Sequence, residues 1–116
     1  MKLKYQDKEI ELLYSFRANI YFEQLQGKNV DFQNFSSNDM IMLFYCIFIS
    51  TLQKNKMPIV SFTDFLDIID DNEGDKCLID FANWYVNIIK NELVIVSDIN
   101  GDDKKLEIED PAKKKN

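Results

Sequence analysis

The chain has 116 residues and a net charge of -6, which argues against nucleic acid as the main partner, because phosphate neutralisation requires clustered lysine and arginine. Hydrophobic residues make up 46% of the sequence and aromatic residues 13%, so one compact domain can form without disulfides. Histidine is absent from the sequence, which excludes Ser-His and Cys-His nucleophile activation. We therefore expect a protein that is not an enzyme.

The first element expected is a short β-hairpin over residues 2–13. Apolar residues at positions 3, 5, 10 and 12 alternate with charged or polar ones on either side of a turn at Gln6-Asp7-Lys8, the pattern of two half-buried strands. The turn lacks the glycine that hairpins favour, and the second half of the pattern also tolerates helix. One helix from Asp7 to Leu25 is therefore the alternative.

A helix is expected from Phe16 to Gly27. Its apolar residues follow the i, i+3, i+4, i+7 spacing of a helix that lays one face on a core, and Gly27 is suited to end it with a left-handed backbone. The residues expected on the buried face are Phe16, Ala18, Ile20, Tyr21, Phe22 and Leu25.

The second helix is expected to be central in the fold. Ser36-x-x-Asp39 resembles a capping box at its start, and the run from Met40 to Ile49 is apolar on all sides, which indicates neighbours on several faces. This run is shorter than the roughly 20 residues that a helix needs to cross a membrane. We therefore expect a core helix and no membrane partner.

Two more helices are expected after Pro58. Ser61-x-x-Asp64 is a second capping signal, ahead of a short third helix, and a longer amphipathic fourth helix includes residues 78–89. The segment 93–96 fits either the end of that helix or an extended strand. The predicted fold is mainly α (α+β), a short N-terminal hairpin followed by about four helices in one compact domain over residues 1–96, with a flexible charged tail over residues 97–116.

Nothing in the sequence indicates a metal or a cofactor. Five acidic residues occur between positions 67 and 75, but glycine stands one place too early for an EF-hand loop, and no glycine-rich phosphate loop exists. These acids are expected to point into solvent around the start of the fourth helix. Cys46 and Cys77 lie in apolar helical patterns without metal-ligand spacing, so we expect buried free thiols and a reducing cytoplasm.

The order of elements resembles the small tail assembly chaperones of long-tailed bacteriophages and prophages. In that family a short strand pair precedes a helix with an F-R-A-x-x-x-x-E-x-x-x-G-K-like pattern, followed by further short helices. The matching residues here are Phe16, Arg17, Ala18, Glu23, Gly27 and Lys28. The later order is also similar, with a central apolar helix, a short helix over residues 63–71 and an amphipathic last helix, so the resemblance covers most of residues 1–96.

The resemblance implies a non-enzymatic protein of the bacterial host cytoplasm that binds the tape-measure protein and helps tail-tube subunits assemble around it. Weak self-association is a further expectation. Phe32 and Phe35, in the loop after the first helix, are the candidate partner-binding residues, and the alternative is that they anchor this loop to the core. The competing function is that of a small acidic regulatory module, like an anti-repressor or antitoxin, that binds a basic partner through residues 67–75.

Overall fold

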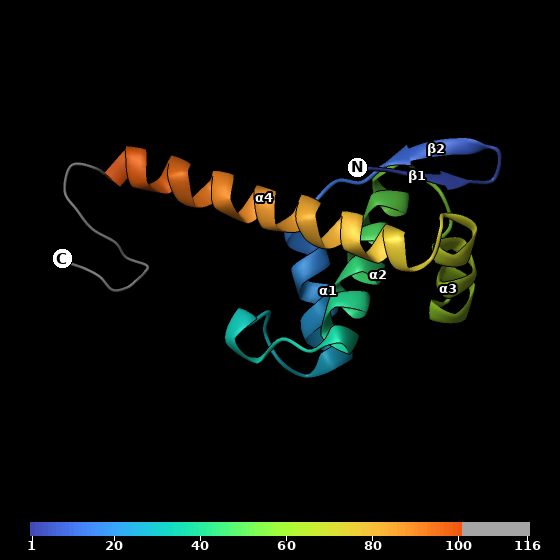
Figure 1. Cartoon of the computed structure of the whole chain (residues 1–116), viewed down its shortest axis with the longest axis horizontal. Helices are drawn as coiled ribbons and strands as arrows, with labels where there is room; N and C mark the ends of the chain where they lie inside the picture. Colours follow the sequence, from blue (N-terminus) through green and yellow to red (C-terminus); the bar gives the residue numbers. More distant parts are fainter. Residues whose placement is uncertain (101–116) are drawn as a thin grey trace. The chain divides into compact units, whose positions relative to one another are not determined.

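The computed structural model describes residues 1–100, apart from the side chains of Phe32 and of residues 92–100. Within this part a two-stranded hairpin precedes four α-helices (Figure 1), which confirms the predicted fold class. Residues 1–82 form one unit, and the chain from Asn83 onward forms a second. The elements are β1 (Lys2–Tyr5), β2 (Lys8–Glu11), α1 (Phe16–Gln26), the 3₁₀ helix η1 (Phe32–Asn34), α2 (Ser37–Lys54), α3 (Phe62–Asp71) and α4 (Asp75–Asn100).

The hairpin forms as predicted, and a single helix from residue 7 to residue 25 is excluded. The strands pair antiparallel with Leu3 opposite Ile10, and both of these side chains are buried. Gln6 and Asp7 in the turn have φ values of 51° and 63°, the left-handed pair that a two-residue type I′ turn requires. Polar residues such as Asp reach this region more readily than bulky apolar ones, so the turn forms without glycine.

Helix α1 ends at Gly27 as predicted, but its buried face is narrower than the sequence indicated. Gly27 has φ 71°, and its N–H donates to the carbonyl of Glu23 at 2.8 Å. Ala18 and Phe22 are fully buried, whereas Phe16 is 79% exposed and Leu25 53% exposed. At 100° per residue, Phe16 lies about 140° around the helix from the middle of the Ala18–Phe22 face. The predicted burial of these two residues was therefore wrong.

Helix α2 runs alongside α1 (Figure 1) and is the central helix, as predicted. Every residue from Leu43 to Leu52 is buried, so the helix has packed neighbours around its whole circumference. The ring of Phe44 stacks on Phe81 at a centroid distance of 4.2 Å and meets Phe65 edge-on at 5.1 Å. Burial of such aromatic rings supplies much of the hydrophobic stabilisation of a small core.

Helix α3 begins at a side-chain cap, as its sequence predicted. The N–H of Asp64 donates to Oγ of Ser61 at 3.1 Å. The last residue of α3 is followed by Asn72, whose side chain binds the backbone of Lys4: Lys4 N–H donates to Oδ1 at 2.9 Å, and Nδ2 donates to the Lys4 carbonyl at 3.0 Å. One side chain therefore fastens the end of α3 to strand β1.

Helix α4 begins after two residues with positive φ, Glu73 at 76° and Gly74 at 51°. Its first two turns belong to the unit of residues 1–82, and the remainder belongs to the second unit. The helix continues to Asn100, so the segment 93–96, which the sequence left open, is helical. The helix also extends four residues into the segment predicted as a tail, whose residues 101–116 lie outside the described part.

Candidate functional site

The loop between α1 and α2 carries the two residues that the sequence suggested for partner binding. Phe35 is half-buried, and its ring stacks on the buried ring of Phe22 with centroids 5.9 Å apart and an angle of 29° between the planes. Phe32 opens η1, but its side chain is outside the described part of the structure. Phe35 therefore joins the loop to the core while remaining partly accessible to solvent.

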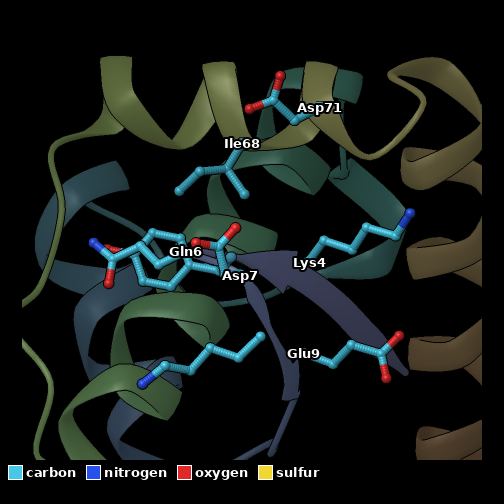
Figure 2. Close-up of a pocket in the computed structure, with 8 residues that line it drawn as sticks. Lys4, Gln6, Asp7, Glu9, Ile68 and Asp71 are labelled. Carbon is cyan, nitrogen blue, oxygen red and sulfur yellow. The ribbon is translucent and has the colours of Figure 1, made fainter.

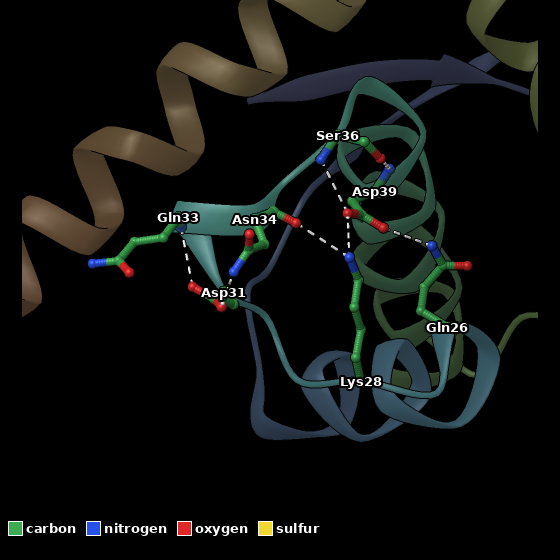
Figure 3. A network of polar contacts seen from close by, with 7 residues as sticks. All are labelled: Gln26, Lys28, Asp31, Gln33, Asn34, Ser36 and Asp39. Carbon is green, nitrogen blue, oxygen red and sulfur yellow. Dashed lines mark hydrogen bonds and ion pairs between the residues drawn. The ribbon is translucent and has the colours of Figure 1, made fainter.

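A buried carboxylate, Asp39, organises the same loop (Figure 3). Nζ of Lys28 donates to Oδ2 of Asp39 at 2.7 Å and to the carbonyl of Asn34 at 3.2 Å, and Nε2 of Gln26 donates to Oδ1 at 2.8 Å. The capping box closes from both sides, because Ser36 N–H donates to Oδ2 and Asp39 N–H donates to the Ser36 hydroxyl, each at 3.0 Å. We call these five residues the Asp39 network.

This network stabilises the ionised form of the Asp39 carboxyl group. The ion pair with Lys28 is the largest cause of a pKa well below the usual carboxyl range, followed by the hydrogen bond from the Ser36 backbone, and burial opposes both. The Asp39 side chain is only 4% exposed, whereas that of Lys28 is 43% exposed. A carboxylate with this many hydrogen-bond donors and a lowered pKa is a poor general base, and its contacts join the loop to the start of α2.

A second carboxylate caps the 3₁₀ helix in the middle of the loop. Asp31 accepts hydrogen bonds from the side chain of Asn34 and from the backbone N–H of Gln33, both at 3.0 Å. The bond from Asn34 is the main reason that the pKa of Asp31 is lowered. Hydrogen bonds to Asp31 and to Asp39 therefore hold both halves of the loop between α1 and α2, which carries Phe35.

A shallow apolar pocket of about 200 Å³ lies between the first turns of α2 and α4, within residues 1–82. Ile79 is 61% exposed, and Met40, Ile41, Leu78 and Ala82 are half-buried. Small-molecule sites usually measure about 300–1,000 Å³, so this volume is better suited to one apolar side chain of a partner. The apolar pocket is lined by Ser37, Met40, Ile41, Leu78, Ile79 and Ala82.

This pocket was not predicted from the sequence, although the sequence contains one signal for it. In the fourth helix, Leu78, Phe81 and Ala82 have the i, i+3, i+4 spacing of one face, and Ile79 lies off that face. A large aliphatic residue on the solvent side of an amphipathic helix can mark a binding surface. That α2 supplies the opposite wall depends on the tertiary structure alone.

A larger, polar pocket of about 630 Å³ lies between the hairpin and α3. Figure 2 shows Ile68 of α3 above the turn residues Gln6 and Asp7. Its charged groups are two ammonium groups and three carboxylates, which can bind ions or polar groups but include no activated nucleophile. The polar pocket is lined by Lys4, Tyr5, Gln6, Asp7, Lys8, Glu9, Ile68 and Asp71.

The acidic residues in α3, in the turn after it and at the start of α4 are exposed, as predicted. None of these five carboxylates forms an ion pair within residues 1–100. No group of three or more metal-ligating side chains gathers in this described part. The acids are Asp67, Asp70, Asp71, Glu73 and Asp75.

Both cysteines are buried free thiols, as the sequence predicted. Burial raises the pKa of Cys46 to about 12 and that of Cys77 to about 11, so the reactive thiolate is scarce at neutral pH. Neither residue is therefore placed as a nucleophile. Across residues 1–100, no helix combines the length and the apolar character needed to cross a membrane.

Comparisons of the chain with protein families, with curated proteins and with solved structures gave no match.

Proposed function

We propose that the protein is a non-enzymatic tail assembly chaperone of a long-tailed bacteriophage or prophage. It binds the tape-measure protein in the bacterial host cytoplasm and assists assembly of the tail tube. The observation that carries this proposal is the element order of residues 1–100: a hairpin, a helix that ends at glycine, a central apolar helix, a short helix and an amphipathic helix. This is the order on which the family resemblance rests.

Two residues of the family-like pattern have clear physical roles that support the proposal. Gly27 ends α1 with a left-handed backbone, and Lys28 then reaches Asp39 at the start of α2. A glycine followed by lysine at this point therefore sets the direction of the loop and anchors it. These roles explain why the pair belongs together in such a fold, independently of any partner.

In our proposal the apolar pocket receives a side chain from a helix of the tape-measure protein. A helix that docks in this way places apolar residues at i, i+3, i+4 and i+7 against its partner. Phe35 is the second contact, because the residue is only half-buried. The net charge of -6 keeps the resulting complex soluble while the apolar stripe of the partner is covered.

The test is co-expression with the tape-measure protein encoded in the same phage or prophage, followed by affinity capture and measurement of that protein's soluble fraction. We expect co-purification and a higher soluble fraction. Ile79→Glu should reduce both, because it places a charge in the apolar pocket. Ile59→Glu is the matched control, since Ile59 is 51% exposed and does not line the pocket.

Phe35→Ala tests the second contact, provided that its circular dichroism spectrum matches that of the wild type. Phe32→Ala is tested in parallel. If the tape-measure protein is equally soluble with and without the chain and no complex forms, the chaperone proposal is wrong. Equal losses for the Ile79 and Ile59 variants would instead place the contact elsewhere on the molecule.

A second candidate function is that of a regulatory module that binds a basic protein. The five exposed and unpaired carboxylates between residues 67 and 75 favour it. An acidic surface of this kind loses affinity steeply as salt is added, whereas apolar capture changes little. Raising the salt concentration from about 50 to about 500 mM shortens the Debye length and screens exposed charges. A complex that dissociates over this range would favour the regulatory module.

A further inference from the structure

The two edges of the hairpin differ in how their backbone groups are satisfied. On the α3 side, the N–H and the carbonyl of Lys4 both bond to the side chain of Asn72, which imitates a neighbouring strand. Figure 1 shows β1 and β2 as a two-stranded sheet, and no third strand joins it within residues 1–100. Within the described part of the chain, no side chain makes a comparable pair of hydrogen bonds to the backbone on the outer edge of β2.

The backbone groups on the outer edge of β2 belong to Glu9 and Glu11. Lys4 is opposite Glu9, and its backbone groups point away from β2 to Asn72, so this is a non-hydrogen-bonded pair of the antiparallel ladder. Glu9 must therefore point its N–H and carbonyl away from β1. The alternation repeats at Glu11, because the next residue, Leu12, donates inward to the Met1 carbonyl at 2.8 Å.

We propose that this edge binds an extended segment of a partner protein in which lysine or arginine alternates with apolar residues. Such a segment adds a third strand to the hairpin through main-chain hydrogen bonds to Glu9 and Glu11. Two strands alone are marginally stable, and a third strand buries additional edge groups. This surface is separate from the apolar pocket, so the inference does not rest on the proposed chaperone function.

The negative charges of Glu9 and Glu11 favour a partner segment with lysine or arginine. Both Glu9 and Glu11 are exposed, and Ile10 between them is buried, so residues opposite the two glutamates lie on the solvent face. The chain already uses the complementary pattern in β1, where Lys4 is opposite Glu9 and Lys2 is opposite Glu11. Opposite charges across neighbouring strands stabilise a sheet. Glu9 has no ion pair within residues 1–100, and Glu11, which accepts a hydrogen bond from the N-terminal ammonium at 2.8 Å, still has a side chain that is 54% exposed.

The same pattern disfavours a second copy of this chain as the occupant. In an antiparallel pair of two β2 strands, the residues that exchange hydrogen bonds are those with outward-pointing backbone groups. These are Glu9 and Glu11 on both strands, so each such register places glutamate directly opposite glutamate. Like charges in this position destabilise the pairing, and the edge therefore discriminates against self-association.

The experiment measures binding of a fluorescein-labelled peptide of alternating lysine and valine to the full chain by fluorescence anisotropy. Its comparison peptide carries N-methyl groups on alternate backbone amides, which preserves charge but prevents strand pairing. We expect saturable binding of the first peptide and at least about tenfold weaker binding of the second. Amide hydrogen exchange should slow at Glu9 and Glu11 but remain unchanged at Ile10, which already bonds inward.

Two variants locate the binding on β2. Glu9→Pro removes an outward N–H and should weaken binding at least about tenfold. Glu9→Gln/Glu11→Gln leaves the backbone intact and should weaken it roughly threefold to tenfold through the loss of two cross-strand charge pairs. Asp67→Asn/Asp70→Asn removes the same charge from α3 and should have no comparable effect.

Four results would overturn the inference. Equal affinity for the N-methylated peptide, or an equal loss in the Asp67 and Asp70 variant, would mean attraction to the overall negative charge alone. Absence of saturable binding would mean that the edge is closed. A wild-type dimer in sedimentation velocity that Glu9→Pro converts to monomer would mean that a second copy occupies the edge.

Discussion

Nζ of Lys28 lies 2.7 Å from Oδ2 of Asp39, across the loop that joins α1 to α2. Lys28 is the first residue after the glycine that ends α1, and Asp39 is in the first turn of α2. The ion pair therefore ties the end of one helix to the start of the next. The same carboxylate completes the capping box of α2, so one side chain serves both the loop and the helix.

Removing either member of this pair should destabilise the fold. We expect Asp39→Asn to lower the melting temperature by roughly 5–10 °C, since it removes the ion pair with Lys28 and replaces one of the two acceptor oxygens with an NH2 donor, and Lys28→Met to lower it by less. The double variant should fall short of the sum, because the two residues interact directly. Thermal unfolding by circular dichroism measures all three.

The control for that experiment is another lysine with a carboxylate partner. Lys76 pairs with Asp80 at 3.2 Å, but both side chains are at least half exposed, and exposed pairs contribute little. Lys76→Met should therefore shift the melting temperature by no more than about 2 °C. Additive effects of the Lys28 and Asp39 substitutions would contradict the direct coupling.

The lowered pKa of Asp39 makes part of the stability depend on pH. Because the folded-state pKa lies below the unfolded value of about 3.9, the contribution is complete above that value and is lost as pH falls toward the folded-state pKa. The difference in unfolding free energy between wild type and Asp39→Asn should be constant from pH 7 to about pH 5 and shrink below about pH 4.

This difference is measured by urea unfolding at a series of pH values from roughly 2.5 to 7. The series extends below and above the carboxyl pKa of the unfolded chain. The pKa values of Glu11 and Asp31 are also lowered, by the N-terminal ammonium and by Asn34 respectively. Both residues are present in wild type and variant, so their contributions cancel. If the difference in unfolding free energy instead grew as the pH falls, the pKa of Asp39 would not be lowered by folding, and this prediction would be wrong.

Asn72 should be required for the attachment of α3 to the hairpin. Asn72→Ala removes both hydrogen bonds to the Lys4 backbone and the bond to the Ile68 carbonyl at 2.8 Å. We expect a loss of about 1–2 kcal/mol in unfolding free energy and faster hydrogen exchange of the Lys4 amide. Asn72→Asp retains the acceptor for that amide, so exchange at Lys4 should be slower than in the alanine variant.

Two phenylalanines allow a direct test of the core assignment. Phe44 is fully buried among aromatic rings, and Phe16 is 79% exposed. Phe44→Ala should cost about 3–5 kcal/mol of unfolding free energy, whereas Phe16→Ala should remain within about 0.5 kcal/mol of the wild type. Chemical denaturation of both variants measures the contrast, and a large loss for Phe16→Ala would mean that its ring is buried in solution.

Much of the architecture could be predicted because its signals are local. Alternation of apolar and charged residues predicted the hairpin, and Ser36 with Asp39 predicted the start of α2. Gly27 predicted the end of α1. Each of these features depends on residues within a few positions of one another, where backbone sterics and hydrogen bonds decide the structure.

The buried face of α1 was predicted too wide, because the spacing of apolar residues does not show how much of the helix its neighbours cover. Phe16 has the spacing of a core residue only if the buried arc is wide. Packing against α2 covers Ala18 and Phe22 and leaves Phe16 exposed. The candidate residue Phe35 was identified from its position in a loop, but its stacking on Phe22 is a contact between distant positions.

By itself, the sequence determined the fold class, the helix caps at Gly27, Ser36 and Ser61, and the burial of both cysteines. Only the tertiary structure decided that Asn72 covers the outer edge of β1, that Lys28 meets Asp39, and that Ile79 lines a pocket with α2. The physical reason is how far apart in the sequence the interacting residues lie. Propensities and caps act between residues close in the chain, whereas edges, ion pairs and pockets form when residues far apart in the sequence pack together.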